Sequence, residues 1–182
     1  RHGTTPRESV EDAKSAIRWL RKYAHYLNID PDRIAAGGGS AGAHIAAAAG
    51  SIPGIEAEGE NPAISSRPDA LVIFNPVLDQ SPGGFGHEEV ADYWRDISPR
   101  HHLGPHSPAT LILSGTEDHL VPVSMLQACA QTLRESGVRC ELDLYEGGTH
   151  GFFNPDRNGP YPETLMSMIR FLEEHGWFPH PA

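Results

Sequence analysis

Apolar residues recur at spacings of three and four between positions 6 and 28, which is the period of an amphipathic helix. Pro6 suits the first turn of such a helix, and Glu8 complements the positive end of its dipole. The pattern therefore predicts one helix over 6–28. Three aromatic residues widen its apolar stripe, and we expect them to pack in the core. They are Trp19, Tyr23 and Tyr26.

Short apolar runs without polar alternation follow, as is typical of strands covered on both faces of a parallel sheet. The predicted strands lie at 33–36, 70–74, 110–114 and 140–145. Helical patterns separate them at 43–50, 123–136 and 161–175. This alternation predicts an α/β fold, a mostly parallel sheet with helices on both faces. The glycine-rich stretch 81–100 interrupts the pattern and is expected to form an irregular, cap-like loop.

Length and charge narrow the class of protein. The 182 residues suit a single domain over 1–182, and 14 basic against 24 acidic residues give a formal net charge of −10. Nucleic-acid binding needs clustered Lys and Arg, so this class is excluded, and no apolar run is long enough for a membrane span. Cys129 and Cys140 allow one disulfide bridge at most, but we expect two reduced thiols.

Residues 38–42 fit the pattern G-x-S-x-G, in which a serine sits on a strained turn between a strand and a helix. A predicted strand precedes the motif and an alanine-rich helix follows it. Small residues at Gly38 and Gly42 are expected to let strand and helix approach closely. No Lys follows Ser40, which disfavours a phosphate-binding loop. Ser40 is therefore the candidate nucleophile.

A serine nucleophile needs a base, and the base needs a carboxylate that orients it. Asp118 follows the strand predicted at 110–114, and His150 follows the one at 140–145. Both side chains are thus expected at the carboxyl ends of strands, where open parallel sheets bind ligands. Asp79, after the strand at 70–74, is a second candidate for the carboxylate, and Glu117 is a weaker one.

The histidine-rich loop carries His101, His102 and His106 but no carboxylate or thiolate at ligand spacing. We expect surface histidines there and no metal site. His44 lies four residues after Ser40 on the same predicted helix, and we expect it to be a packed or surface residue rather than the base. No pattern in the sequence calls for a cofactor.

The chain resembles the α/β-hydrolase superfamily, and within it bacterial acetyl-esterase and lipase-like carboxylesterases, including carbohydrate-ester deacetylases. The stretches that carry the resemblance are 30–34, 38–42, 74–79, 115–118 and 145–153. The resemblance implies that Ser40 is the nucleophile, His150 the general base and acid, and Asp118 the orienting acid. It also implies that the backbone N–H of Ala41 donates to the oxyanion. The implied activity is hydrolysis of short acyl esters, acetyl esters of carbohydrates among them, without a cofactor.

The N-terminal part of the chain differs from the family pattern. The family has about eight strands, whereas this chain shows four, which resemble strands five to eight. The glycine motif that gives the second oxyanion donor is absent, and residues 1–6 look like the loop after the fourth strand. We therefore expect a truncated-looking domain with an exposed apolar edge at 33–36, covered by a second copy of the chain or an upstream segment. Loss of one oxyanion donor costs about 10²–10³ in turnover, so weak activity is expected unless a partner or a rearranged loop supplies that donor.

The sequence indicates substrate-contacting residues less clearly than the catalytic ones. Gly39 in the motif, and Phe85 and Trp94 in the cap-like loop, are the candidates for contacts with a small-molecule or carbohydrate ester. Two other functions compete with the esterase. One is a serine peptidase of the prolyl-oligopeptidase type, which shares the serine motif. The other is a fragment or pseudoenzyme that only binds.

Overall fold

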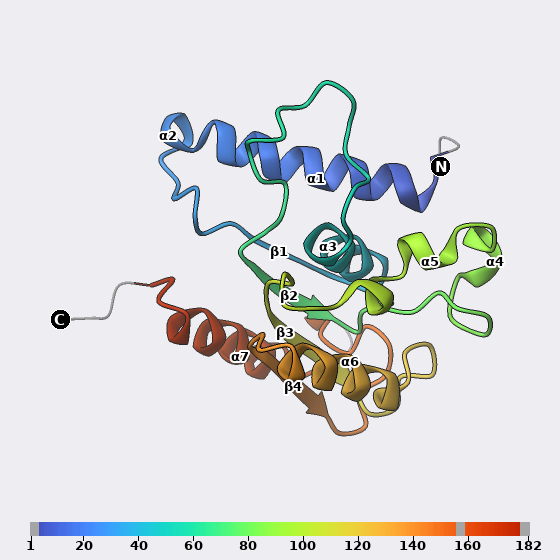
Figure 1. The fold of residues 1–182 in the computed structure, drawn as a ribbon. Helices are drawn as coiled ribbons and strands as arrows, with labels where there is room; N and C mark the ends of the chain where they lie inside the picture. Colours follow the sequence, from blue (N-terminus) through green and yellow to red (C-terminus); the bar gives the residue numbers. More distant parts are fainter. Residues whose placement is uncertain (1–3, 156–158, 179–182) are drawn as a thin grey trace.

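The computed structural model describes residues 4–155 and 159–178, and its centre is a four-stranded sheet (Figure 1). All strand pairs are parallel, and the order in the sheet is β1-β2-β3-β4. Residues 1–3, part of the front segment compared above with a family loop, lie outside the described residues. The elements are α1 (Pro6–Lys22), α2 (Ala24–Leu27), β1 (Ala35–Gly39), α3 (Ala41–Ser51), β2 (Ala70–Phe74), α4 (His87–Val90), α5 (Trp94–Ile97), η1 (Pro99–His102), β3 (Ala109–Gly115), α6 (Val123–Glu135), β4 (Cys140–Tyr145) and α7 (Tyr161–Glu174). Within the described ranges, none of the helices has the length and hydropathy to cross a bilayer.

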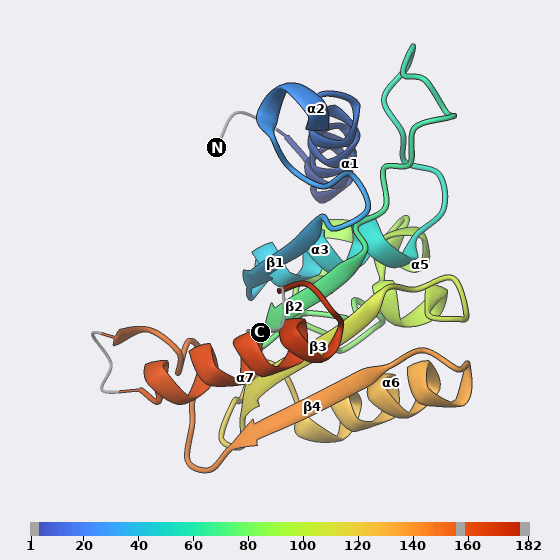
Figure 2. The ribbon, with the colours of Figure 1, turned by 90° about the vertical axis from the view of Figure 1, so that its left-hand side faces the viewer.

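Helices cover both faces of the sheet, as the sequence predicted. Successive side chains of a strand point to opposite faces. Leu71 and Ile73 of β2 therefore pack with α3 and α6, whereas Val72 of β2 and Leu111 of β3 pack on the face covered by α7 (Figure 2). Burial on both sides explains why these runs lack polar alternation. The α/β fold with a parallel sheet is confirmed.

The first strand differs from its prediction in place and in burial. A buried strand was expected over 33–36, but β1 reaches Gly39 and lies at the edge of the sheet with Ala35 and Gly37 exposed. Glycine disfavours strands, yet a Cβ at Gly37 would lie 2.6 Å from the carbonyl oxygen of Val72. Close pairing with β2 thus requires glycine here. Cover of this edge by a second copy or an upstream segment stays a prediction.

The first helix is shorter than predicted, because α1 ends at Lys22 and α2 follows as a separate turn. The expectation that its aromatic residues pack in the core was wrong for two of them. Trp19 is 53% exposed and Tyr26 is 85% exposed, because α1 buries Val10 and Ile17 on its α3 side instead. The glycine-rich excursion after β2 was expected to be irregular, but it contains the short helices α4, α5 and η1.

The two cysteines are free and buried, which agrees with the expected reduced thiols. They lie on α6 and β4, in the core that α6 shares with the sheet. Burial raises the pKa of Cys129 to about 12 and that of Cys140 to about 11. Both side chains therefore stay protonated thiols at neutral pH and act as small apolar groups.

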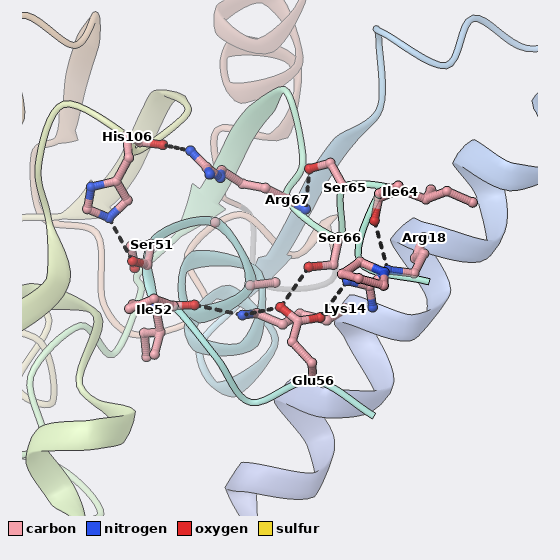
Figure 3. A pocket seen from close by; sticks show the side chains of 15 residues that line it. Lys14, Arg18, Ser51, Ile52, Glu56, Ile64, Ser65, Ser66, Arg67 and His106 are labelled. Carbon is pink, nitrogen blue, oxygen red and sulfur yellow. Dashed lines mark hydrogen bonds and ion pairs between the residues drawn. The ribbon is translucent and has the colours of Figure 1, made fainter. Parts of the chain in front are cut away.

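A buried lysine fastens the long loop after α3 to α1 (Figure 3). Lys14 Nζ donates to the carbonyl oxygens of Ile52 (2.6 Å) and Gly54, and it pairs with Glu56 (3.1 Å). Arg18 also pairs with Glu56, at 2.8 Å. Burial lowers the pKa of Lys14, although Glu56 partly compensates. A cavity of about 450 Å³ is lined by Lys14, Arg18 and Glu56 but by no residue of the 38–42 motif. Because the charged groups are engaged with one another and with backbone carbonyls, we interpret this network as structural.

Lys14→Met tests this role. The variant leaves the two carbonyl oxygens and Glu56 without their donor, so we expect the free energy of unfolding to fall by about 3 kcal/mol. Urea denaturation measures it. The control Lys22→Met changes an exposed lysine on the same helix and should stay within about 0.5 kcal/mol of the wild type. Equal stability of the two variants would contradict a structural role of Lys14.

Candidate active site

Ser40 occupies a strained turn between β1 and α3. Its backbone has φ 55° and ψ −118°, a conformation that residues other than glycine rarely adopt. Two hydrogen bonds hold it there: the Ser40 N–H donates to the Phe74 carbonyl oxygen (3.0 Å), and its own carbonyl oxygen accepts from the His44 N–H (3.0 Å). The neighbouring strand and the following helix thus fix the position of the serine, as the motif predicted.

A chain of hydrogen bonds connects Ser40 to the other two predicted residues. His150 Nε2 lies 2.8 Å from Ser40 Oγ, and His150 Nδ1 lies 2.8 Å from Asp118 Oδ2. A carboxylate only accepts hydrogen bonds, so Nδ1 carries the proton and Nε2 is left to accept from the serine hydroxyl. The structure therefore brings together Ser40, His150 and Asp118 from the ends of three different strands.

The Asp118 carboxylate is buried and held rigidly. Its side chain is 0% exposed, and Oδ1 accepts from the backbone N–H groups of Leu120 (2.9 Å) and Val121 (3.0 Å). The second oxygen is thereby directed at the imidazole. His150 itself is 26% exposed in its side chain, so solvent and small molecules reach the ring. A fixed acid next to a reachable base is the arrangement that serine activation needs.

The rival carboxylates lie elsewhere. Asp79 Oδ2 accepts from Arg100 (2.6 Å), and its Oδ1 accepts from the Ser81 N–H (2.9 Å). Burial raises the pKa of Asp79, but the hydrogen bonds from Ser81 and Arg100 outweigh this effect and leave it below its usual value. Glu117 is exposed to solvent. Of the three candidate carboxylates, Asp118 is the one within hydrogen-bond distance of the imidazole.

The glycines of the motif have unequal roles. A Cβ at Gly38 would lie 2.8 Å from the Gly42 carbonyl carbon, so the close approach of strand and helix requires glycine there. The same expectation for Gly42 was wrong, because a Cβ at Gly42 would meet no atom within 4 Å. Gly39 contacts the ring of Phe153, to which a Cβ would come within 2.5 Å. Ala41 is the first residue of α3, so its N–H has no acceptor within the helix.

Two cavities meet at Phe85, which is 50% exposed. The smaller, about 100 Å³, touches Ala41 and has largely apolar walls. The larger, about 480 Å³, extends past Asp79 and Arg100 towards the loop after Asp118. Trp94, the other predicted contact from the cap-like loop, lines neither cavity. Its ring packs against the rings of His87 and His101 instead.

The other histidines considered in the sequence, at positions 44, 101, 102 and 106, are not gathered into a second site. His44 is buried and its Nε2 lies 2.9 Å from the Ile97 carbonyl oxygen; burial lowers its pKa despite this contact. It is a packed residue. His101 and His106 are exposed and His102 is half-buried. Over 4–155 and 159–178, no group of three or more His, Cys, Asp or Glu side chains is placed to hold a metal ion.

One neighbour of the imidazole was missed as a functional residue. Asn75 is the first residue after β2, it is fully buried, and its Nδ2 lies 3.3 Å from His150 Nε2. In the sequence it drew attention only as part of the 74–79 stretch. An amide side chain directly after a buried strand, at the ligand-binding edge of a parallel sheet, was the available signal.

Family models and solved structures show which proteins this chain resembles. Residues 4–82 match the model described as BD-FAE, and residues 90–170 match the dienelactone hydrolase family. The solved structure of Thermogutta terrifontis esterase 2 phosphoramylated by tabun is 41% identical with a TM-score of 0.92, and the match covers 100% of this chain and 69% of that one. The same esterase is also known with propionate and with butyrate bound.

Curated relatives are more distant and longer. The probable isoprenylcysteine alpha-carbonyl methylesterase ICMEL1 of Arabidopsis thaliana is 28% identical over 89% of this chain, and the match spans 40% of that protein. The acetylxylan esterase of Xylanibacter ruminicola is 27% identical over 79% of this chain and 31% of its own length. The chain thus spans less than half of either relative. Together with the solved esterase, these matches place it in one class: the chain belongs to the α/β-hydrolase carboxylesterases.

The two glycines of the motif provide a matched test of the turn. We expect Gly38→Ala to lower the free energy of unfolding by about 1–3 kcal/mol, because its methyl group collides with backbone atoms of α3. Gly42→Ala meets open space inside a helix, where alanine is favoured over glycine by up to about 1 kcal/mol. Thermal or urea denaturation compares the two. Equal losses of stability in both variants would contradict the close approach at Gly38.

Proposed function

We propose that this chain carries the catalytic centre of a serine carboxylesterase that cleaves short acyl esters. The observation that carries the proposal is the hydrogen-bond chain from Asp118 through His150 to Ser40, with 2.8 Å at each step. Nucleophile, base and orienting acid at these distances fulfil the geometric requirement for an activated serine. The relatives named above as esterases support the same reaction class.

In the proposed reaction, Ser40 Oγ attacks the ester carbonyl carbon and its proton moves to His150 Nε2. The negative charge on the carbonyl oxygen faces the Ala41 N–H at the positive end of α3. The tetrahedral intermediate collapses, the C–O bond to the alcohol breaks, and His150 returns the proton to the departing alcohol. Water then repeats the sequence on the acyl-enzyme, which releases the carboxylic acid and restores Ser40.

The cavities support a small acyl group and a larger polar alcohol. The cavity of about 100 Å³ beside Ala41 has room for an acyl group of only a few carbon atoms. The cavity of about 480 Å³ has charged walls at Asp79 and Arg100, which suit a leaving group rich in hydroxyls. An acetylated carbohydrate combines these two properties. An acetylxylan esterase among the relatives supports this substrate class.

Covalent labelling tests the nucleophile. We expect a fluorophosphonate to add one mass equivalent to the intact protein and Ser40→Ala to abolish the adduct. Ser15→Ala on α1 is the matched control and should label as the wild type does. His150→Ala should slow hydrolysis of p-nitrophenyl acetate nearly as much as Ser40→Ala, because the two residues act as a unit.

Three results would contradict the proposal. Labelling that persists in Ser40→Ala would show that Ser40 is not the nucleophile. Cleavage of Xaa-Pro amides faster than acetyl esters would favour the peptidase. If the wild type shows neither labelling nor turnover, the protein only binds.

A further inference from the structure

We propose that Asn75 is a positioning residue that keeps Nε2 of His150 unprotonated and directed at the hydroxyl of Ser40, so that it can take the serine proton. This inference rests on the proposed function, since it concerns the same imidazole. Asn75 follows β2 directly, between the turn that carries Ser40 and the end of β3. Its N–H donates to the Leu113 carbonyl oxygen at 2.7 Å, and the preceding Phe74 carbonyl oxygen accepts from the Ser40 N–H at 3.0 Å. The backbone on both sides is therefore fixed.

The backbone of Asn75 is strained. Its φ is 34°, in the region that favours glycine, and the residue is fully buried. Asparagine tolerates positive φ better than most residues, but glycine adopts it without a steric penalty. Strain of this kind persists where the surrounding structure enforces it, and it clusters at active sites. The side chain of Asn75 is therefore expected to contribute something that glycine would lack.

The side-chain amide of Asn75 contacts two neighbouring residues of the loop after β4, His150 and Gly151. Oδ1 lies 3.4 Å from the backbone nitrogen of Gly151, and Nδ2 lies 3.3 Å from His150 Nε2. A backbone N–H only donates, so it must face the amide oxygen, and this fixes the orientation of the amide. The Nδ2 group is then directed at the imidazole. Asn75 thereby connects the end of β2 to the loop after β4.

The contact selects a protonation state. Asp118 holds the proton of His150 on Nδ1, so the Nε2 lone pair accepts from both Ser40 Oγ and Asn75 Nδ2. A second donor at Nε2 favours the neutral imidazole, which is the form that removes the serine proton. Once Nε2 is protonated, the same N–H group faces another N–H and the contact becomes unfavourable. Asn75 thus favours the base before attack and the release of the proton afterwards.

The substitution Asn75→Asp replaces the amide donor beside His150 Nε2 with a carboxylate acceptor of nearly the same shape. A carboxylate beside Nε2 favours the protonated imidazole, so we expect the acidic limb of the kcat/KM profile to move to higher pH. Asn75→Gly removes the amide and relieves the backbone strain. We expect it to lower kcat roughly 10- to 100-fold, with a smaller change in KM, because the imidazole loses its second anchor.

A matched control comes from Asn28, which also has positive φ (53°) but lies at the end of α2. Asn28→Gly should leave kcat and the pH profile unchanged. An unmoved acidic limb in Asn75→Asp, together with full kcat in folded Asn75→Gly, would overturn the proposal. A residue that only supports the fold would lower stability without moving that limb.

A measurement on the wild type avoids any folding defect of the variants. The side-chain amide protons of Asn75, followed by ¹⁵N-edited NMR, should shift with pH at the same midpoint as the His150 imidazole. Amide shifts that stay constant through the imidazole titration would overturn the contact. This readout does not depend on ester hydrolysis, so it separates failure of the Asn75 role from failure of the proposed esterase.

Discussion

The parallel pairing of four strands brings their carboxyl ends to one edge of the sheet, and the candidate site depends on this constraint. The register aligns Gly39 with Phe74, and Phe74 with Leu113. The next residues along the chain are therefore neighbours in space, although they are far apart in sequence. Ser40 and His150 are 110 positions apart, yet their side chains lie at hydrogen-bond distance. No single loop could supply this precision without the sheet beneath it.

Two of the four non-glycine residues with positive φ in the described part of the chain lie at the same edge. Ser40 and Asn75 have positive φ without being glycines, and each directly follows a strand. Hydrogen bonds between neighbouring strand ends hold both residues in place. The Lys14 network is a contrasting case, since its charges are engaged in fastening a loop to α1. The charged groups around Lys14 are thus structural, while the proposed chemistry uses a different set of groups.

Much of the fold could be predicted from the sequence, because hydrophobic runs and their alternation with helical patterns reflect burial directly. The predicted strands over 70–74 and 140–145 have the observed limits. The first strand was misplaced, because glycines at its end serve close pairing with β2, which sequence patterns do not record. Trp19 was misjudged for a related reason: the helical period identifies a face but not how far that face is covered.

The three candidate residues could be found because each follows a predicted strand and has a suitable side chain. Their distances could not be predicted, since these depend on how the loops after β3 and β4 fold. Asn75 was missed because its contribution depends on an orientation set by Gly151. Trp94 was chosen as an aromatic residue of the cap-like loop, but its packing partners His87 and His101 depend on how that loop folds, which the sequence does not record.

The assignment of Asp118 as the orienting acid is tested most directly by replacing each of the two candidate aspartates, Asp118 and Asp79, with asparagine in separate variants. Asp118→Asn keeps the shape but no longer holds the imidazole in the required tautomer, so kcat for p-nitrophenyl acetate should fall by about 10⁴. Asp79→Asn disturbs the ion pair with Arg100 away from the imidazole. Because the p-nitrophenyl leaving group is not the hydroxyl-rich alcohol proposed for the cavity at Asp79, this variant should retain most of the turnover with p-nitrophenyl acetate. Near-normal turnover in Asp118→Asn, with the large loss in Asp79→Asn instead, would contradict the assignment of the site.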